Sequence, residues 1–356
     1  MRIAHVRERT APAGTPFRLA AALGPGERPR RWLDLEVARR RLVAADPGRA
    51  HNSASVRVPL TTLDDHLARG LRVAALGEVL DHAALLAAGV DADDPGDDAN
   101  LDAADLQFGP PILRPPSFRD FYAFERHVAT IWGRRGADVP EAWYRLPIFY
   151  FSNTLRIFGP DEDVEFPSAT NNLDYELEIG VVIGKEGRNV KEKDWLQYVA
   201  GVTIFNDWSC RDLQRDEMAA GLGPAKGKDS ATSLGPYVVT PDELTIRDGK
   251  LFANCVLKVN GEKWMEENAS IAHHSWGAMI ERASRDSRIV PGDVLGSGTV
   301  TGGTIGEAMR NGLPARWLKP GDVIEIEVEG IGTLRSKLTE PSISDPDYRF
   351  KSAVTL

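Results

Sequence analysis

The chain of 356 residues is long enough for one to three domains, and its composition, 42% hydrophobic and 27% charged, is typical of a folded globular protein. A formal net charge of −9 argues against a nucleic-acid-binding protein, which would carry net positive charge. Cys210 and Cys255 lack the spacing of a disulfide framework or a thiolate zinc site, so we expect two buried free thiols. No signal-peptide-like stretch begins the sequence, and residues 71–90 are too charged to span a bilayer, so we expect a cytoplasmic protein without a membrane partner.

The first part of the chain is expected to form a small N-terminal domain, residues 1–110. It contains an expected strand over 17–23, helical spacing of apolar residues over 33–42, and a second helical region over 60–88. The acidic stretch 91–98 contains Pro and Gly and lacks periodic apolar residues, which indicates a surface loop or linker. We expect the second domain to comprise residues 111–356.

Apolar residues recur at helical spacing over 117–132, and Ser117 can cap the start, so the pattern predicts a helix. On that helix Asp120 and His127 would lie two turns apart beside the apolar stripe. A histidine beside such a stripe is more often a hydrogen-bonded core residue than a catalytic one. The aspartate on the same face favours the catalytic interpretation.

The stretch 173–184 alternates as a strand does, so Asp174, Glu176 and Glu178 are expected on one face. Neighbouring carboxylates repel each other, so this group is either open to water or arranged around a positive charge. The apolar run after Glu178 favours a buried strand and hence the second alternative. Residues 323–329 show the same alternation, which we interpret as an antiparallel strand with a solvated acidic face.

A further carboxylate, Asp207, follows the expected strand 202–205. Strand ends hold functional side chains well, although Asp207 could instead cap a helix that starts near Ser209. The glycine-rich stretches 221–230 and 296–302 lack the spacing of phosphate-binding and dinucleotide-binding loops. We therefore expect no nucleotide cofactor.

The remainder is rich in expected strands. Asn260-Gly261 predicts a hairpin between 254–259 and 262–265. A helix is expected over 270–282, carrying His273 and His274 as surface or packing residues. The predicted fold class is therefore α+β and β-rich.

Ordered motifs now stand together: Asp120-Phe121-Tyr122 with His127, Asp174-Tyr175-Glu176-Leu177-Glu178, Asn206-Asp207-Trp208-Ser209 with Arg211, Asp212 and Gln214, Gly227-Lys228, Gly298-Thr299, and Leu318 to Asp322. This set resembles the fumarylacetoacetate hydrolase family over residues 114–338. The resemblance implies that family's mixed β-sandwich roll, a smaller extra N-terminal domain as in its longer members, and a homodimer.

The resemblance also implies roles for individual residues. It implies a divalent cation held by Asp120, Glu176, Glu178 and Asp207. It implies His127 as the base that activates water, Lys228 and Gln214 as oxyanion stabilisers, and Tyr122, Tyr150 and Thr299 at the substrate. Shorter members carry a Glu three residues after the His, where this chain has Thr130; Glu307 is the candidate that orients His127. Arg134 or Arg135, of which we name Arg135, is the candidate for gripping a substrate carboxylate.

An all-oxygen ligand set suits Mg²⁺, Ca²⁺ or Mn²⁺ rather than Zn²⁺, and we expect Mg²⁺. The predicted activity is metal-dependent hydrolysis of a C–C bond in a β-diketone or acylpyruvate-type acid such as fumarylacetoacetate, a step in the catabolism of aromatic compounds, through a metal-stabilised enolate. One alternative is a decarboxylase, isomerase or dehydratase that acts on a 2-oxo acid through the same enolate. Another is a binding or scaffold protein that has lost turnover.

Overall fold

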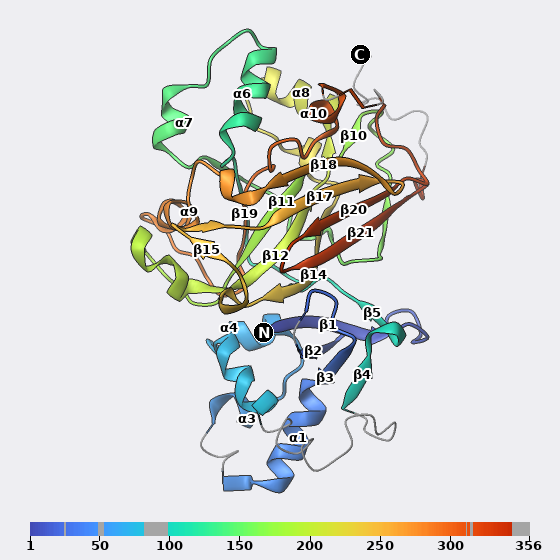
Figure 1. The fold of residues 1–356 in the computed structure, drawn as a ribbon, viewed down its shortest axis with the longest axis vertical. Coiled ribbons are helices and arrows are strands. Elements are labelled where there is room, and N and C mark those ends of the chain that lie inside the picture. The colour runs from blue at the N-terminus through green and yellow to red at the C-terminus, as the bar shows by residue number, and fades with distance from the viewer. Residues whose placement is uncertain (25, 49–52, 82–98, 311, 314–315, 344–356) are drawn as a thin grey trace.

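A computed structural model describes residues 1–24, 26–48, 53–81, 99–310, 312–313 and 316–343. Two large sheets, of twelve and five strands, pack against each other, and the helices gather around their ends (Figure 1). The predicted β-rich α+β class is confirmed. None of the helices in the described part of the chain has the length and apolar character needed to cross a bilayer.

The larger sheet runs in the order β4-β3-β2-β1-β14-β12-β11-β19-β6-β7, with β5 beside β1 and β8 beside β14. Its strands are β1 (Arg2–Glu8), β2 (Arg18–Leu23), β3 (Arg31–Asp34), β4 (Asn100–Asp102), β5 (Leu106–Phe108), β6 (Phe118–Phe121), β7 (Phe149–Phe151), β8 (Ile157–Phe158), β11 (Leu177–Ile183), β12 (Val199–Asp207), β14 (Thr232–Val239) and β19 (Val294–Gly296). The N-terminal strands continue this sheet through the β1–β14 pair, and the expected boundary at residue 110 stays a prediction.

The second sheet has the order β18-β17-β20-β21-β9. Its strands are β9 (Asp163–Glu165), β17 (Asn254–Val259), β18 (Glu262–Asn268), β20 (Val323–Val328) and β21 (Gly332–Thr339). The predicted hairpin is confirmed, with Asn260 and Gly261 at φ of 53° and 81°, the left-handed conformation that such a turn requires. Buried and partly exposed residues alternate along β20, which confirms the prediction for 323–329. The buried residues of β17, β20 and β21 pack with those of β11 and β12 into one core.

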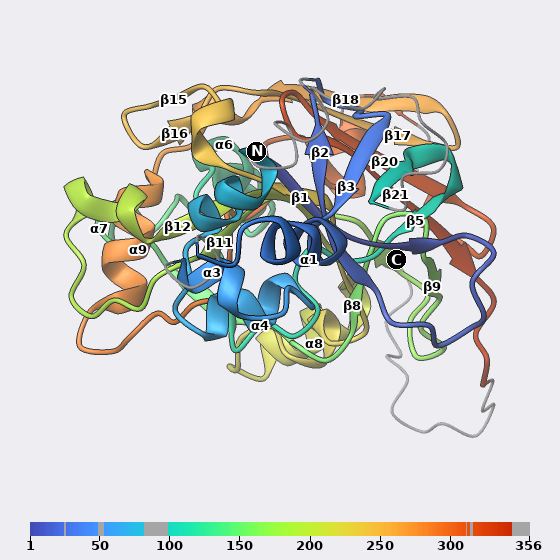
Figure 2. The ribbon, with the colours of Figure 1, turned by 90° about the horizontal axis from the view of Figure 1, so that it is seen from below.

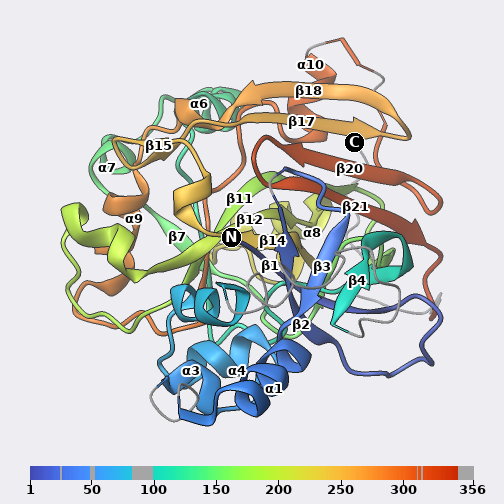
Figure 3. The ribbon, with the colours of Figure 1, turned by 60° about the horizontal axis from the view of Figure 1, so that its bottom comes forward.

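Helices pack on both parts of the chain. They are α1 (Leu35–Ala45), α3 (Ala54–Arg57), α4 (Leu63–Ala68), α6 (Glu125–Arg134), α7 (Glu141–Arg145), α8 (Arg211–Ala219), α9 (Trp276–Ser284) and α10 (Ile305–Arg310), with 3₁₀ turns that include Val73–Leu76, Glu192–Tyr198 and Lys226–Lys228. Helices α1, α3 and α4 gather on one side of the N-terminal strands (Figures 2 and 3). There they share a second apolar core with residues of β2, β12 and β14.

The predicted helix over 117–132 is wrong in its first half. Phe118–Phe121 is the fully buried strand β6, and only Glu125–Arg134 is helical. Short apolar runs are ambiguous between the two structures, and here pairing with β19 and β7 selects the strand. Ser117 caps no helix; its hydroxyl donates to Asp293. Asp120 and His127 therefore lie on different elements.

Three smaller expectations also change. The stretch 173–184 divides into β10 (Leu173–Asp174) and β11, because β10 pairs with β13 (Ser209–Cys210) in a sheet of their own. Helix α8 begins after Cys210, so Asp207 is not its cap. The expected helix 270–282 begins at Trp276, capped by Ser275, so His273 and His274 precede it and pack around Trp143.

Other expectations are met in part. The region 60–88 contains α4 and the turn Val73–Leu76, and its residues from 82 onward lie outside the described part of the chain, as does the expected loop 91–98. Cys210 and Cys255 are buried free thiols, as predicted. Burial raises the pKa of each thiol, to about 11 and about 12.

Candidate metal centre and catalytic site

Four buried carboxylates converge at one end of the large sheet. One oxygen of each of Asp120, Glu176, Glu178 and Asp207 lies within 4.8 Å of the others. Strand order explains the convergence. Asp120 on β6 and Glu178 on β11 lie on the two strands that flank β19, and Asp207 lies on β12, the next strand beyond β11. Glu176 lies just before β11, where its N–H donates to the side chain of Asn206 at 3.0 Å.

Gly296 of β19 permits this convergence. It pairs with Asp120 on one side and with Gly180 on the other. A Cβ atom at Gly296 would lie 2.3 Å from Oδ1 of Asp120 and 2.7 Å from the Phe205 ring. A residue with a side chain would therefore push Asp120 out of its position.

Two cations accompany the carboxylates. Lys228 contacts Oε2 of Glu176 at 2.8 Å and also binds Oδ2 of Asp207. The Arg211 guanidinium donates to Oε1 of Glu176 at 2.7 Å. Both Lys228 and Glu176 are almost fully buried, so these charges interact with little screening by water.

The glycine-rich loop serves to place Lys228. The carboxylate of Glu217 accepts hydrogen bonds from the backbone N–H groups of residues 225–227. It thus takes the place that a phosphate group takes in a phosphate-binding loop. Gly227 packs so closely on α8 that a Cβ would lie 2.7 Å from the backbone nitrogen of Gln214. This close approach brings Lys228 beside the carboxylates.

The carboxylates carry more negative charge than the two cations balance. Burial, followed by the charge of Asp207, raises the pKa of Asp120 to about 7. Burial and the neighbouring carboxylates raise the pKa of Glu178 well above its ordinary value. Although burial opposes it, Lys228 and then Arg211 hold the pKa of Glu176 below its ordinary range.

The orphaned oxygens of the cluster fit a divalent cation. Among the described residues, no donor reaches either carboxylate oxygen of Glu178 or Oδ1 of Asp207, although all three atoms are buried. Buried carboxylate oxygens normally have partners, and their absence here matches an oxygen-preferring ion such as Mg²⁺, Ca²⁺ or Mn²⁺. The residues present therefore fit the cation that the sequence predicted.

His127 and Glu307 form a buried pair beside the cluster. Nδ1 of His127 lies 2.9 Å from Oε2 of Glu307, although the two residues are 180 positions apart. Although burial opposes it, the contact with His127 lowers the pKa of Glu307. An ionised Glu307 accepts from Nδ1–H and leaves Nε2 of His127 as the basic nitrogen. The His127 ring lies against the ring of Tyr122, two residues after Asp120, so it lies close to the carboxylates.

The predicted substrate residues are placed as follows. The Tyr150 hydroxyl donates to Oδ2 of Asp207, and the Tyr122 ring stands edge-on to His127 at 5.6 Å between centroids. Thr299 is buried one residue after Gly298, whose N–H donates to Asp120. Arg135 is exposed and stacks on Trp132.

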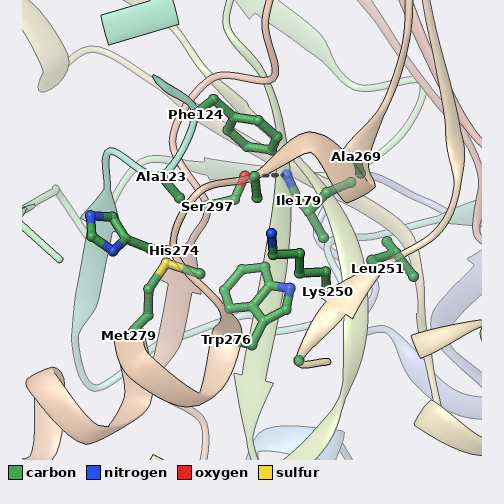
Figure 4. A pocket seen from close by; sticks show the side chains of 12 residues that line it. Ala123, Phe124, Ile179, Lys250, Leu251, Ala269, His274, Trp276, Met279 and Ser297 are labelled. Carbon is green, nitrogen blue, oxygen red and sulfur yellow. Dashed lines mark hydrogen bonds between the residues drawn. The ribbon is translucent and has the colours of Figure 1, made fainter. Parts of the chain in front are cut away.

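Two hollows differ greatly in size. A cavity of ≈ 360 Å³ is lined by Glu307 together with Arg126, Thr130, Trp264, Met265, Glu266, Glu267, Thr301 and Gly302. Its volume is in the range of small-molecule sites. The hollow in Figure 4, around Ser297, Lys250 and Trp276, has a volume of ≈ 10 Å³, enough for about one water molecule.

Some contacts escaped the sequence reasoning. Arg211 bridges Asp174, Glu176 and Gln214. The charge pattern of the sequence did not indicate this role. The alternation over 173–184 placed Asp174 with the other carboxylates, whereas its side chain turns to Arg211 and does not join the cluster. A strand break at 175–176 causes this difference.

Comparison with known proteins decides the family. The family description "Fumarylacetoacetate (FAA) hydrolase C-terminal" matches residues 117–339, more than half of the chain. The chain belongs to the fumarylacetoacetate hydrolase family. An uncharacterized protein of Staphylococcus haemolyticus is 30% identical over 255 residues, which are 70% of this chain and 78% of the relative.

Two solved structures share the fold over 96% of this chain, a span that includes most of its N-terminal part. A fumarylacetoacetate hydrolase from Exiguobacterium antarcticum superposes with a TM-score of 0.65 and 20% identity, covering 96% of this chain and 100% of the other. A 5-carboxymethyl-2-hydroxymuconate delta-isomerase from Mycobacterium smegmatis gives 0.61 and 21%, with the same coverage. The extra N-terminal part is therefore a feature that these members share with this chain.

Proposed function

We propose that this member of the fumarylacetoacetate hydrolase family is a divalent-metal-dependent hydrolase of a C–C bond in a β-diketone or acylpyruvate-type acid such as fumarylacetoacetate. The observation that carries the proposal is the His127–Glu307 pair beside the four carboxylates. A decarboxylase needs an electron-accepting site but no activated water, whereas a hydrolase needs a base for water. The contact between His127 and Glu307 supports the assignment of His127 as that base.

The cation would be held by Asp120, Glu176, Glu178 and Asp207, and Mg²⁺ is the ion that we propose. When bound, it supplies Lewis-acid stabilisation of negative charge on a carbonyl oxygen. Titration with Mg²⁺, Mn²⁺ and Ca²⁺ tests which ion the site binds, since all three accept such ligands.

The chain's own groups divide the remaining work. His127 takes a proton from water at Nε2, and Glu307 stabilises the resulting imidazolium through Nδ1–H, a step typically worth ~10²–10⁴-fold in rate. Lys228 and the amide of Gln214 provide fixed positive charge and a hydrogen-bond donor for an oxyanion. Although burial opposes it, Asp207 and Glu176 raise the pKa of Lys228, which therefore stays charged during the reaction.

We assign Tyr122, Tyr150 and Thr299 to the substrate because they border these groups. Arg135 is exposed and stacks on Trp132 of α6, the helix that carries His127, which supports a role in attracting a substrate carboxylate. Of the proposed catalytic and substrate residues, only Glu307 lines the larger cavity, so the cavity does not by itself define the substrate position.

A second candidate function is isomerisation or decarboxylation of a 2-oxo acid. A solved delta-isomerase structure shares the fold and the overall length of this chain, which supports this second candidate. Such a reaction uses the cation and Lys228 but forms no second acid from water.

The test is turnover of fumarylacetoacetate, acylpyruvates and oxaloacetate with Mg²⁺, Mn²⁺ or EDTA. Release of two acids that depends on the metal supports the hydrolase. Release of CO₂ alone, or double-bond migration without cleavage, replaces it by the second candidate. Unchanged substrate throughout would leave a binding protein that has lost turnover.

Assembly and location also belong to this proposal. A homodimer is proposed from the family resemblance. Light scattering tests it, and the expected mass is twice the 39.0 kDa of one chain. We also propose a place in aromatic catabolism and in the cytoplasm, which fractionation of the source cells would test.

A further inference from the structure

Asp174 lies between two groups of catalytic candidates without belonging to either. Its Oδ2 accepts from Nε of Arg211 at 2.7 Å, and its Oδ1 accepts from the backbone N–H of Ile305 at 2.9 Å. The residue is 1% exposed, so these two contacts replace its hydration. Each carboxylate oxygen thus holds a different segment of the chain.

The first segment is the oxyanion and metal side of the site. Arg211 donates to Oε1 of Glu176 at 2.7 Å and to Oε1 of Gln214 at 3.0 Å. Because the carbonyl oxygen of Gln214 accepts from Arg211, its NH₂ group is the part left to donate to a substrate. Anchoring Arg211 at Nε therefore fixes both a metal-ligand candidate and an oxyanion donor.

The second segment is the base side of the site. Ile305 is the first residue of α10, which carries Glu307. The preceding residue, Thr304, donates its hydroxyl to Oε2 of Glu307 at 3.1 Å, and that same oxygen contacts His127. The contact between Asp174 and Ile305 therefore fixes the turn that aims Glu307 at His127.

We propose that Asp174 is a positioning residue that ties the metal and oxyanion half of the site to the His127–Glu307 half. The inference rests on the proposed function of those residues. A carboxylate suits this position because two donors approach from two segments and one of them is a cation. Asparagine keeps one acceptor oxygen and turns a donor NH₂ toward the other partner, so Asp174→Asn loses one of the two ties.

Asp322→Asn is the matched control. Asp322 is also buried and also accepts from a guanidinium, that of Arg316, and from a backbone N–H, that of Lys319. It lies in the turn before β20, and none of its contacts is with a proposed catalytic residue. If the two variants lose the same amount of stability, a greater loss of activity in Asp174→Asn reports on positioning and not on folding.

The activity experiment is a pair of double-mutant cycles. Asp174→Asn is expected to lower kcat by about 10–100-fold, as loss of a group that orients catalytic residues typically does, with KM changed much less. Combined with Glu307→Gln, and separately with Gln214→Ala, it should cost less than the product of the single effects, because the residues act as one unit. Multiplicative effects, or kcat within about 2-fold of wild type, would overturn the proposal.

Two further readouts do not depend on turnover. Amide exchange over residues 304–309 should be faster in Asp174→Asn than in Asp322→Asn, and calorimetry should show Mn²⁺ binding weakened by about 10-fold or more in Asp174→Asn alone. Unchanged exchange and unchanged Mn²⁺ affinity would overturn the positioning role. If the wild-type chain turns over no substrate but both readouts change, the proposed activity falls and the tie through Asp174 stands.

Discussion

Lys228 and Asp207 meet through one oxygen of the carboxylate. Oδ2 of Asp207 accepts from Lys228 and also from the Tyr150 hydroxyl, while Oδ1 has no donor among the described residues. Lys228 and the phenol thus both bind Oδ2 and leave Oδ1 without a donor among the described residues. This arrangement gives the ligand group a fixed geometry and a free oxygen.

Glu178→Gln should change stability and metal binding in opposite directions. Glu178 is 0% exposed, and its charge is opposed by three neighbouring carboxylates. Removing the charge should raise the free energy of unfolding in EDTA by about 1–3 kcal/mol, while weakening Mg²⁺ binding by about 10²-fold or more. Thermal unfolding with EDTA and with Mg²⁺ measures both.

Glu325→Gln is the control for that prediction. Glu325 lies on the partly exposed face of β20, so its substitution should change neither quantity measurably. A Glu178→Gln variant that is less stable in EDTA would show that the carboxylate is satisfied without a cation.

Gly296→Ala should displace Asp120. The added methyl group would lie 2.3 Å from its Oδ1, and buried strands on both sides prevent relaxation. We expect Mn²⁺ affinity to fall by about 10-fold or more and stability to fall by about 1–3 kcal/mol. Gly133→Ala in α6, where the added Cβ meets nothing within 4 Å, should be neutral or stabilising. Equal Mn²⁺ affinity in the two variants would contradict the account.

His5 should make stability depend on pH. The buried ring bonds the carbonyl of Pro110 through Nδ1 and accepts the N–H of Leu63 at Nε2. Burial lowers its pKa below 6.5, although Pro110, Asp64 and Asp65 oppose the shift. Because the folded pKa is the lower one, this stabilisation is present above about pH 6.5 and is lost as the pH falls through the folded pKa.

The measurement is urea unfolding of wild type and His5→Gln between pH 7.5 and 5. Glutamine retains a donor and an acceptor but does not titrate. Wild type should lose up to about 2 kcal/mol more than the variant over this range, at 1.36 kcal/mol per pKa unit. If the two stability curves run parallel with pH, His5 does not contribute to the pH dependence, and the dependence that remains comes from other groups such as His66.

Local pattern was sufficient for part of the site. The period of a strand placed Glu176 and Glu178 on one side, and both lie in the cluster. Family resemblance supplied Asp120, Asp207 and the distant Glu307, which spacing alone could not connect to His127.

Long-range pairing determined what the sequence did not reveal. Residues 118–121 have helical spacing, but β19 and β7 supply the partners that make them a strand. The tie between Asp174 and Arg211 depends on the β10–β13 register, and the need for Gly296 depends on the side chain of Asp120 from another strand. None of these partners is near in sequence, so no local pattern encodes them.

The central claim is that His127, oriented by Glu307, activates water beside a bound cation. Its most direct test compares His127→Gln and Glu307→Gln with wild type in Mg²⁺-dependent cleavage, with Mn²⁺ affinity measured in parallel. The account predicts that kcat falls by about 10²–10⁴-fold in His127→Gln, and less in Glu307→Gln, while Mn²⁺ affinity stays near that of wild type. Cleavage by His127→Gln at the wild-type rate would contradict it.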